Sequence, residues 1–242
     1  MSTLARGTRL RLTELARQPT TLAMLVVLPP VVIEVYGAGL ASFPSLPSLG
    51  MDPGTAGRLT GTLFAVAFLA GLVGLFQVIS ARSGDERLAL CGYPRTTLLA
   101  TRLATMLAVV VVGTAVSFAM FALEVDVAAP LSAVGALALA GLIYGLLGVI
   151  VGTVLPRGLE GSLVLVFMAD MDNVLASGIF DLGTNLAAFS PLYHPHALFE
   201  RAVLDGTVAT DHVLPALAYA GVLLVVAVLA YGRAVGDGGG LA

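Results

Sequence analysis

The residues of this sequence that could do chemistry are polar side chains set in an apolar stretch near position 170. Asp170, Asn173, Ser177 and Asp181 recur at intervals of three or four residues, whereas Asp172 falls out of step with them. Because an α-helix turns about 100° per residue, the first four form one stripe and Asp172 points roughly 200° away. Carboxylates in an apolar helix cost about 2.5–3.5 kcal/mol each on insertion scales, which makes them functional candidates. We predict that the stripe lines a translocation path and that Asp172 bonds to a neighbouring helix, the alternative being that the stripe only holds helices together.

Three other chemistries fit some of these residues. Asp170 and Asp172 could relay protons in a secondary transporter, which is the main alternative function. Ser177 could pair with a histidine of the following segment in an intramembrane enzyme, and the two aspartates could bind a metal with His194 and His196. The sequence has neither a Gly-x-Ser-x-Gly turn nor a His-Glu-x-x-His helix, and nothing fixes the geometry of a metal site. We therefore expect no catalytic residue, metal or cofactor in the chain.

The elements that must position these residues are membrane-spanning helices. Hydrophobic residues make up 58% of the 242 positions and charged residues 11%, and the mean hydropathy is +0.98. Because a soluble domain needs about 25% charged residues, most of this surface faces something other than water. The composition predicts an all-α membrane protein that forms a single transmembrane domain over residues 1–242. Six apolar stretches are long enough to cross about 30 Å of hydrocarbon, at residues 21–40, 59–79, 98–123, 131–155, 158–180 and 213–232.

The arginines predict how these spans are oriented. The chain has 12 arginines and no lysine. Ten of the arginines precede the first span, follow the last span, or lie in or beside the loops between spans two and three and between spans four and five. Only Arg58 and Arg201 lie on the other side. By the positive-inside rule the side with ten arginines is cytoplasmic, so both termini are predicted to be cytoplasmic in a prokaryotic plasma membrane.

Residues 1–20 are expected to form an amphipathic helix in the cytoplasmic interface. Leu4, Leu12 and Leu15 recur at helical spacing, and arginines lie off that stripe. Two alternatives are a frayed arginine-rich tail and a cleaved signal peptide, although a signal peptide has a shorter charged region and a shorter apolar core.

The loop at residues 80–97 is predicted to contain a short helix at the cytoplasmic surface. Ser83 or Asp85 can cap its start, and Glu86 then lies favourably in the first turn. Gly92 suits the helix end and Pro94 the first turn of the next helix. A loop that only connected two spans would not require such caps.

Two further segments carry structural predictions. Residues 181–212 are too polar to span the membrane and too apolar for a free loop, so we predict a re-entrant or interfacial hairpin turned at Ser190 and Pro191. Small residues repeat every three or four positions along the fourth span, which permits close helix packing. They are Gly141, Gly145, Gly148 and Gly152.

Taken together, these segments resemble the membrane subunits of type-2 ATP-binding-cassette exporters. Residues 6–17 resemble the elbow helix of that family and residues 85–95 its coupling helix. Residues 176–180 (Ala-Ser-Gly-Ile-Phe) and 190–194 (Ser-Pro-Leu-Tyr-His) resemble its outer re-entrant segment. The coupling loop departs from the family, in which a Gly-Thr-Leu stretch often follows the glutamate, whereas Arg87-Leu88-Ala89 follows Glu86 here.

The resemblance implies that this chain is a permease driven by a separate ATPase subunit. A Gly-x-x-x-x-Gly-Lys-Ser/Thr phosphate cradle is excluded because the chain has no lysine, so ATP hydrolysis is expected in the partner. Two copies of this chain, or one copy and a related half, are expected in each complex. The residues expected to contact the ATPase are Asp85, Glu86, Arg87, Leu88, Tyr93 and Arg95.

Overall fold

The computed structural model describes residues 7, 13, 17, 19–43, 51–155, 157–178 and 187–236. Within them every regular element is a helix, as the composition predicts. The helices are α2 (Pro19–Ala41), α3 (Pro53–Ile79), α4 (Arg82–Leu90), α5 (Arg95–Glu124), α6 (Pro130–Val154), α7 (Gly158–Ala176), α9 (Tyr193–Leu204) and α10 (Thr210–Gly236). The predicted elbow at residues 1–20 lies almost entirely outside the described residues.

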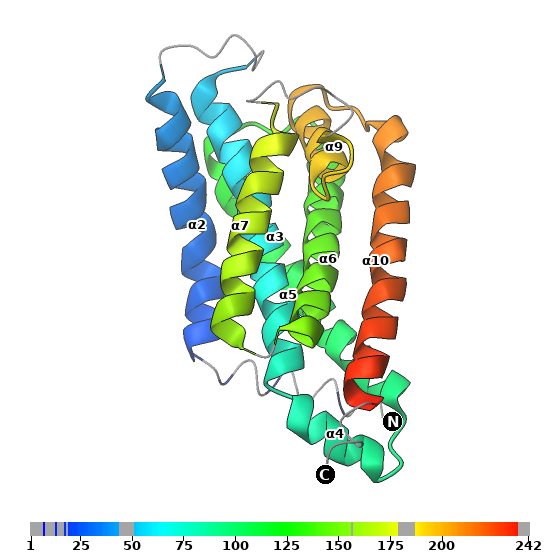
Figure 1. The fold of residues 1–242 in the computed structure, drawn as a ribbon. Coiled ribbons are helices and arrows are strands. Elements are labelled where there is room, and N and C mark those ends of the chain that lie inside the picture. The colour runs from blue at the N-terminus through cyan, green and yellow to red at the C-terminus, as the bar shows by residue number, and fades with distance from the viewer. Residues whose placement is uncertain are drawn as a thin grey trace.

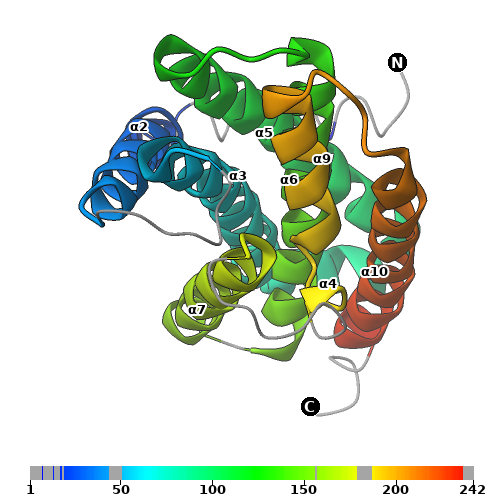
Figure 2. The same cartoon turned by 90° about the horizontal axis from the view of Figure 1, so that it is seen from above.

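The long helices run lengthwise through one bundle, with α4 at one end and α9 at the other (Figure 1). The first turn of α2 and the last turn of α10 lie at the end that carries α4 (Figure 1). Seen along the bundle, α3 lies between α2, α5, α6 and α7 (Figure 2), and it packs against all four. α3 is therefore the central element, and most of its residues are buried.

Among the described residues, five helices are long and apolar enough to cross a membrane, which is compatible with a multi-pass membrane protein. They are α2, α3, α5, α6 and α10. They coincide with five of the six predicted spans, with end points that differ by at most six residues, the largest difference being at the start of α3. The remaining predicted span, at residues 158–180, corresponds to α7. This helix has 19 residues and carries three acidic side chains, Glu160, Asp170 and Asp172, so its assignment as a span stays a prediction. α2 and α10 expose many apolar side chains on their outer faces, as lipid contact requires.

Local sequence explains where several helices begin. Pro53 and Pro130 occupy the first turns of α3 and α6, where the absent N–H has no intrahelical partner to lose. Asp52 caps α3 by accepting a hydrogen bond from the Thr55 amide over 2.9 Å. α2 continues through Pro29 and Pro30.

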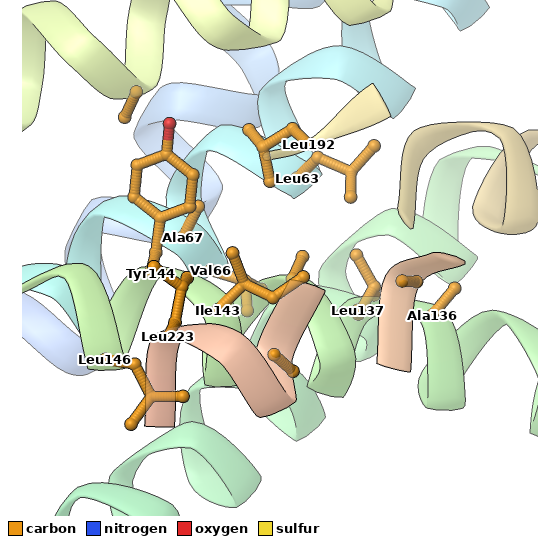
Figure 3. Close-up of a cluster of buried hydrophobic side chains, with 14 of the residues drawn as sticks. Leu63, Val66, Ala67, Ala136, Leu137, Ile143, Tyr144, Leu146, Leu192 and Leu223 are labelled. Atoms are coloured by element: carbon orange, nitrogen blue, oxygen red, sulfur yellow. The ribbon is translucent and has the colours of Figure 1, made fainter. Parts of the chain in front are cut away.

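The predicted small-residue packing along the fourth span is confirmed. α3 and α6 approach so closely that a methyl group at Gly148 would overlap the carbonyl oxygen of Gly71, and one at Gly74 would overlap that of Gly145. At Gly152 the same methyl group would lie 2.9 Å from the Leu75 carbonyl oxygen. The two backbones thus meet directly, and buried side chains of both helices form the core beside them (Figure 3).

The predicted short helix between spans two and three exists as α4, but its predicted capping is wrong. The N-cap residue is Ala81, with no side-chain cap bond, and Asp85 is instead buried in the first turn. Gly92 adopts the left-handed conformation (φ 85°) just past the helix end, as expected. Pro94 is the N-cap of α5 and lies one residue before its first turn.

The segment before α10 packs against the bundle. Residues 179–186 lie outside the described residues, so the first arm of the predicted hairpin is not described. Ser190 and Pro191 lie in the bend and turn that lead into α9, while the hairpin itself stays a prediction. α9 packs on α6, α7 and α10. The amides of Ala128 and Ala129 donate to the Val203 and Ala202 carbonyls, which ties the loop before α6 to this helix.

Candidate functional site

A buried ion pair fixes α4 to the spanning helices. Asp85 of α4 is 1% exposed and Arg102 of α5 is 4% exposed. Arg102 Nη2 donates to Asp85 Oδ1 over 2.8 Å, and its Nε donates to Oδ2 over 3.2 Å. The Tyr231 hydroxyl of α10 donates to the same Oδ2 over 2.6 Å. We call these three residues the anchor, because they join α4, α5 and α10 through one carboxylate.

The anchor divides the predicted ATPase-contact residues into two groups. Asp85 faces inward, so it is unsuited to contact another protein, which corrects that part of the expectation. Arg87, Leu88 and Arg95 are exposed. Glu86 and Tyr93 are half-buried, and Glu86 pairs with Arg82 over 3.3 Å on the helix surface. Leu90, which is 78% exposed, adds an apolar side chain to the outward face that the prediction did not include.

The second polar centre is the turn of α7 around Asp172. This carboxylate is buried, and its Oδ2 accepts hydrogen bonds from the Tyr144 hydroxyl of α6 over 2.5 Å and from the Leu192 amide over 3.0 Å. In Figure 3 the Tyr144 hydroxyl lies at the edge of the cluster of apolar side chains and points out of it. Ser190 donates to the Asp172 carbonyl over 3.3 Å. Asp172 is therefore bonded to a neighbouring long helix, as predicted, and it also holds the entry to α9.

The predicted stripe on α7 faces other helices of the same chain. Asp170 accepts a hydrogen bond from the Tyr36 hydroxyl of α2, and Asn173 Nδ2 donates to the Thr60 carbonyl of α3 over 2.9 Å. Ser177 lies in the turn after α7 and donates to the Val174 carbonyl over 2.9 Å. The fourth member, Asp181, lies outside the described residues. The stripe thus faces the bundle interior at Asp170 and Asn173, and its role as a translocation path stays a prediction.

The histidines lie at the end of the bundle opposite α4. His194 Nδ1 and His212 Nδ1 are 2.9 Å apart, so one nitrogen donates and the other accepts. Burial, with a smaller contribution from the neighbouring His212, lowers the pKa of His194. His196 is buried, and burial lowers its pKa to about 4. Among the described residues no group of three or more His, Cys, Asp or Glu could hold a metal ion, so the alternative with Asp170, Asp172 and two histidines finds no support.

The sequence did not reveal the partners of these acidic residues. Tyr36, Tyr144 and Tyr231 each donate to a carboxylate 28 to 146 positions away, and Arg102 pairs with Asp85 across the turn between α4 and α5. No local spacing links such pairs. A tyrosine or arginine inside a predicted span is the only available signal, because a polar group there must find a partner in the protein.

No model of a protein family matches the chain, and no curated protein matches it.

Proposed function

We propose that this chain is the permease subunit of an ATP-driven exporter similar to the type-2 ATP-binding-cassette exporters, and that α4 is its contact with a separate ATPase subunit. In this proposal α7 is the sixth span, both termini are cytoplasmic, and a second copy or a related half completes the translocation path. The membrane is the prokaryotic plasma membrane.

The observation that carries the proposal is the anchored helix α4. A connecting loop would be mobile and solvated, whereas α4 is tied to α5 and α10 by a charge that is buried in the protein. Its outward face combines charged residues with exposed Leu88 and Leu90. Exposed apolar side chains on a rigid helix outside the membrane favour a protein partner. A force applied to α4 would reach two long helices directly through the anchor.

The only cysteine of the chain supports a direct test, because Cys91 is exposed at the C-cap of α4. A photoactivatable maleimide attached to Cys91 should crosslink to a protein that contains the Gly-x-x-x-x-Gly-Lys-Ser/Thr motif, identified by mass spectrometry of the adduct. The matched control carries Cys91→Ser and Glu160→Cys, which moves the probe to an exposed site on α7.

Arg87→Glu combined with Leu90→Asn should abolish the crosslinked product while the permease still inserts in the membrane. A partner without a nucleotide-binding motif, or an equal yield from the control position, would refute the proposal.

A second candidate function is a proton-coupled secondary transporter. It is favoured by Asp172, whose Oδ1 is buried and has no hydrogen-bond partner among the described residues. A proton carrier must expose such a group in turn to each side of the membrane, whereas Asp172 is bonded to Tyr144 and to the Leu192 amide. An ionophore that dissipates the proton gradient distinguishes the two, since it should stop a proton-coupled carrier and leave ATP-driven transport running.

A further inference from the structure

Asp170 is a carboxylate of α7, and its hydrogen-bond partner is a neutral group. The Tyr36 hydroxyl donates to it, and no arginine or histidine of the described residues forms an ion pair with it. The side chain is half-buried, so it is neither solvated as on a protein surface nor sealed in the core as Asp172 is. With α7 as the sixth span of the proposed permease, a carboxylate at this position is expected to pair with a cation or to face a cavity.

The basic residue of the adjoining part of α3 is already engaged. Arg58 follows Gly57, and a methyl group at Gly57 would overlap the carbonyl oxygen of Tyr36, so this part of α3 lies directly against the backbone of Tyr36. Its guanidinium lies 3.3 Å from Glu34 and 3.8 Å from Glu124, so it is shared by two other carboxylates. Arg58 is therefore engaged by two other carboxylates and does not neutralise Asp170.

Aromatic rings line up beside the carboxylate. The rings of Tyr36 and Phe64 are stacked with centroids 5.6 Å apart, and those of Phe64 and Phe68 follow at 5.5 Å. Phe68 in turn packs against the cluster that contains Leu165 of α7. The row thus runs from α2 across α3 toward α7, and ring faces of this kind attract both cations and apolar groups.

A buried acceptor lies one helical turn from Asp170. Asn173 is fully buried, and its Nδ2 is used by the Thr60 carbonyl. Its Oδ1 has no hydrogen-bond donor among the described residues. Residues three apart on a helix lie on the same side, so a carboxylate and an amide oxygen, both acceptors, are presented together. A buried acceptor without a donor is costly, and an N–H group would satisfy it.

We propose that the region between α2, α3 and α7 binds a lipophilic organic ammonium ion. The Asp170 carboxylate pairs with the ammonium group and Asn173 Oδ1 accepts a hydrogen bond from one of its N–H groups. The partly exposed rings at the two ends of the row, Tyr36 and Phe68, contact its apolar body. This inference rests on the proposed function in one respect, since it names the substrate class of the predicted translocation path. Binding itself requires neither ATP nor the partner subunit.

The chain contains no tryptophan, so the indole fluorescence of a ligand can be read against the purified protein without interference. We would titrate tryptamine, an indole with an ammonium group, and indole-3-propionate, a similar indole with a carboxylate, into the protein in detergent micelles. Fluorescence anisotropy should rise with tryptamine and stay flat with indole-3-propionate. Equal binding of the two ligands would overturn the proposal.

Variants then locate the site. Asp170→Asn should weaken tryptamine binding about tenfold or more, the loss expected for a charge-assisted contact, and Tyr36→Phe should keep binding because the ring remains. Asp205→Asn, the same change at an exposed residue of the loop after α9, should bind like the unmodified protein. Unchanged binding by a folded Asp170→Asn variant would overturn the proposal. If that variant does not fold, the discrimination between the two indoles decides.

The inference and the proposed function fail separately. If tryptamine does not bind but crosslinking from Cys91 still captures the ATPase, the ammonium site is wrong and the permease assignment stands. If tryptamine binds as proposed and no ATPase is captured, the site stands and the protein belongs to another class of transporter.

Discussion

The anchor makes a sharp prediction about α4. Replacing Arg102 with methionine, which has a similar length and no charge, leaves the Asp85 carboxylate buried with only the Tyr231 hydroxyl as a donor. Breaking a buried ion pair in this way costs about 3–5 kcal/mol, because the remaining charge is desolvated without compensation. α4 can escape this cost by detaching and exposing Asp85 to water. We therefore expect Arg102→Met to loosen α4 before it unfolds the bundle.

The exposed ion pair on the same helix gives a matched control. Arg82 pairs with Glu86 over 3.3 Å, and their side chains are 43% and 29% exposed. Arg82→Met makes the same chemical change, and an exposed pair is worth only about 0–1 kcal/mol. In the double variant Asp85→Leu with Arg102→Met no charge is stranded, so most of the lost stability should return.

Hydrogen exchange followed by mass spectrometry measures the effect at α4 itself. A loss of about 3 kcal/mol corresponds to amides of residues 82–93 exchanging at least about 100-fold faster, while those of α3 and α6 change little. The reasoning is refuted if Arg102→Met exchanges no faster at α4 than Arg82→Met does. It is also refuted if the double variant is as loose as the single one, because the effect would then not come from an unpaired charge.

Three further predictions concern packing, pH and topology. Gly148→Ala should cost about 1–3 kcal/mol or prevent assembly of the bundle, because its methyl group overlaps the α3 backbone. Gly135→Ala on the same helix meets no atom within 4 Å and should be neutral. The thermal loss of the monodisperse peak on gel filtration compares the two variants. Burial lowers the pKa of His196 from 6.5 to about 4 in the folded state. The unfolded state therefore binds more protons between these two values, and the free energy of unfolding should fall by up to about 3 kcal/mol as the pH drops from 6.5 to 4. The difference between the unmodified protein and His196→Gln isolates this contribution in pH-dependent melting, and parallel curves would contradict it. Cys91 should react with an impermeant maleimide in inside-out vesicles and not on whole cells. Asp126→Cys in a Cys91→Ser background should show the opposite pattern. The reverse labelling of the two sites would invert the predicted orientation.

The sequence by itself determined the fold class and most helix positions. Apolar stretches of the length of a bilayer can only be helices, because every backbone N–H and C=O must be satisfied within the segment. That requirement is local, so five of the predicted spans coincide with long apolar helices in the structure. The end of α4 was also local, since Gly92 adopts a conformation that other residues avoid. The close packing of the fourth span followed from its small residues alone.

Which polar residues are paired, and with what, was decided only by the tertiary structure. Asp85 was a plausible helix cap by sequence, yet it is buried against Arg102 and Tyr231, because three helices converge at that point. Helical periodicity correctly separated Asp172 from Asp170, since angular position is a property of a single helix. It could not supply Tyr144 or Tyr36, which come from α6 and α2. Their distances from α7 along the chain carry no periodic signal, and only the packing of the bundle brings these hydroxyl groups to the carboxylates.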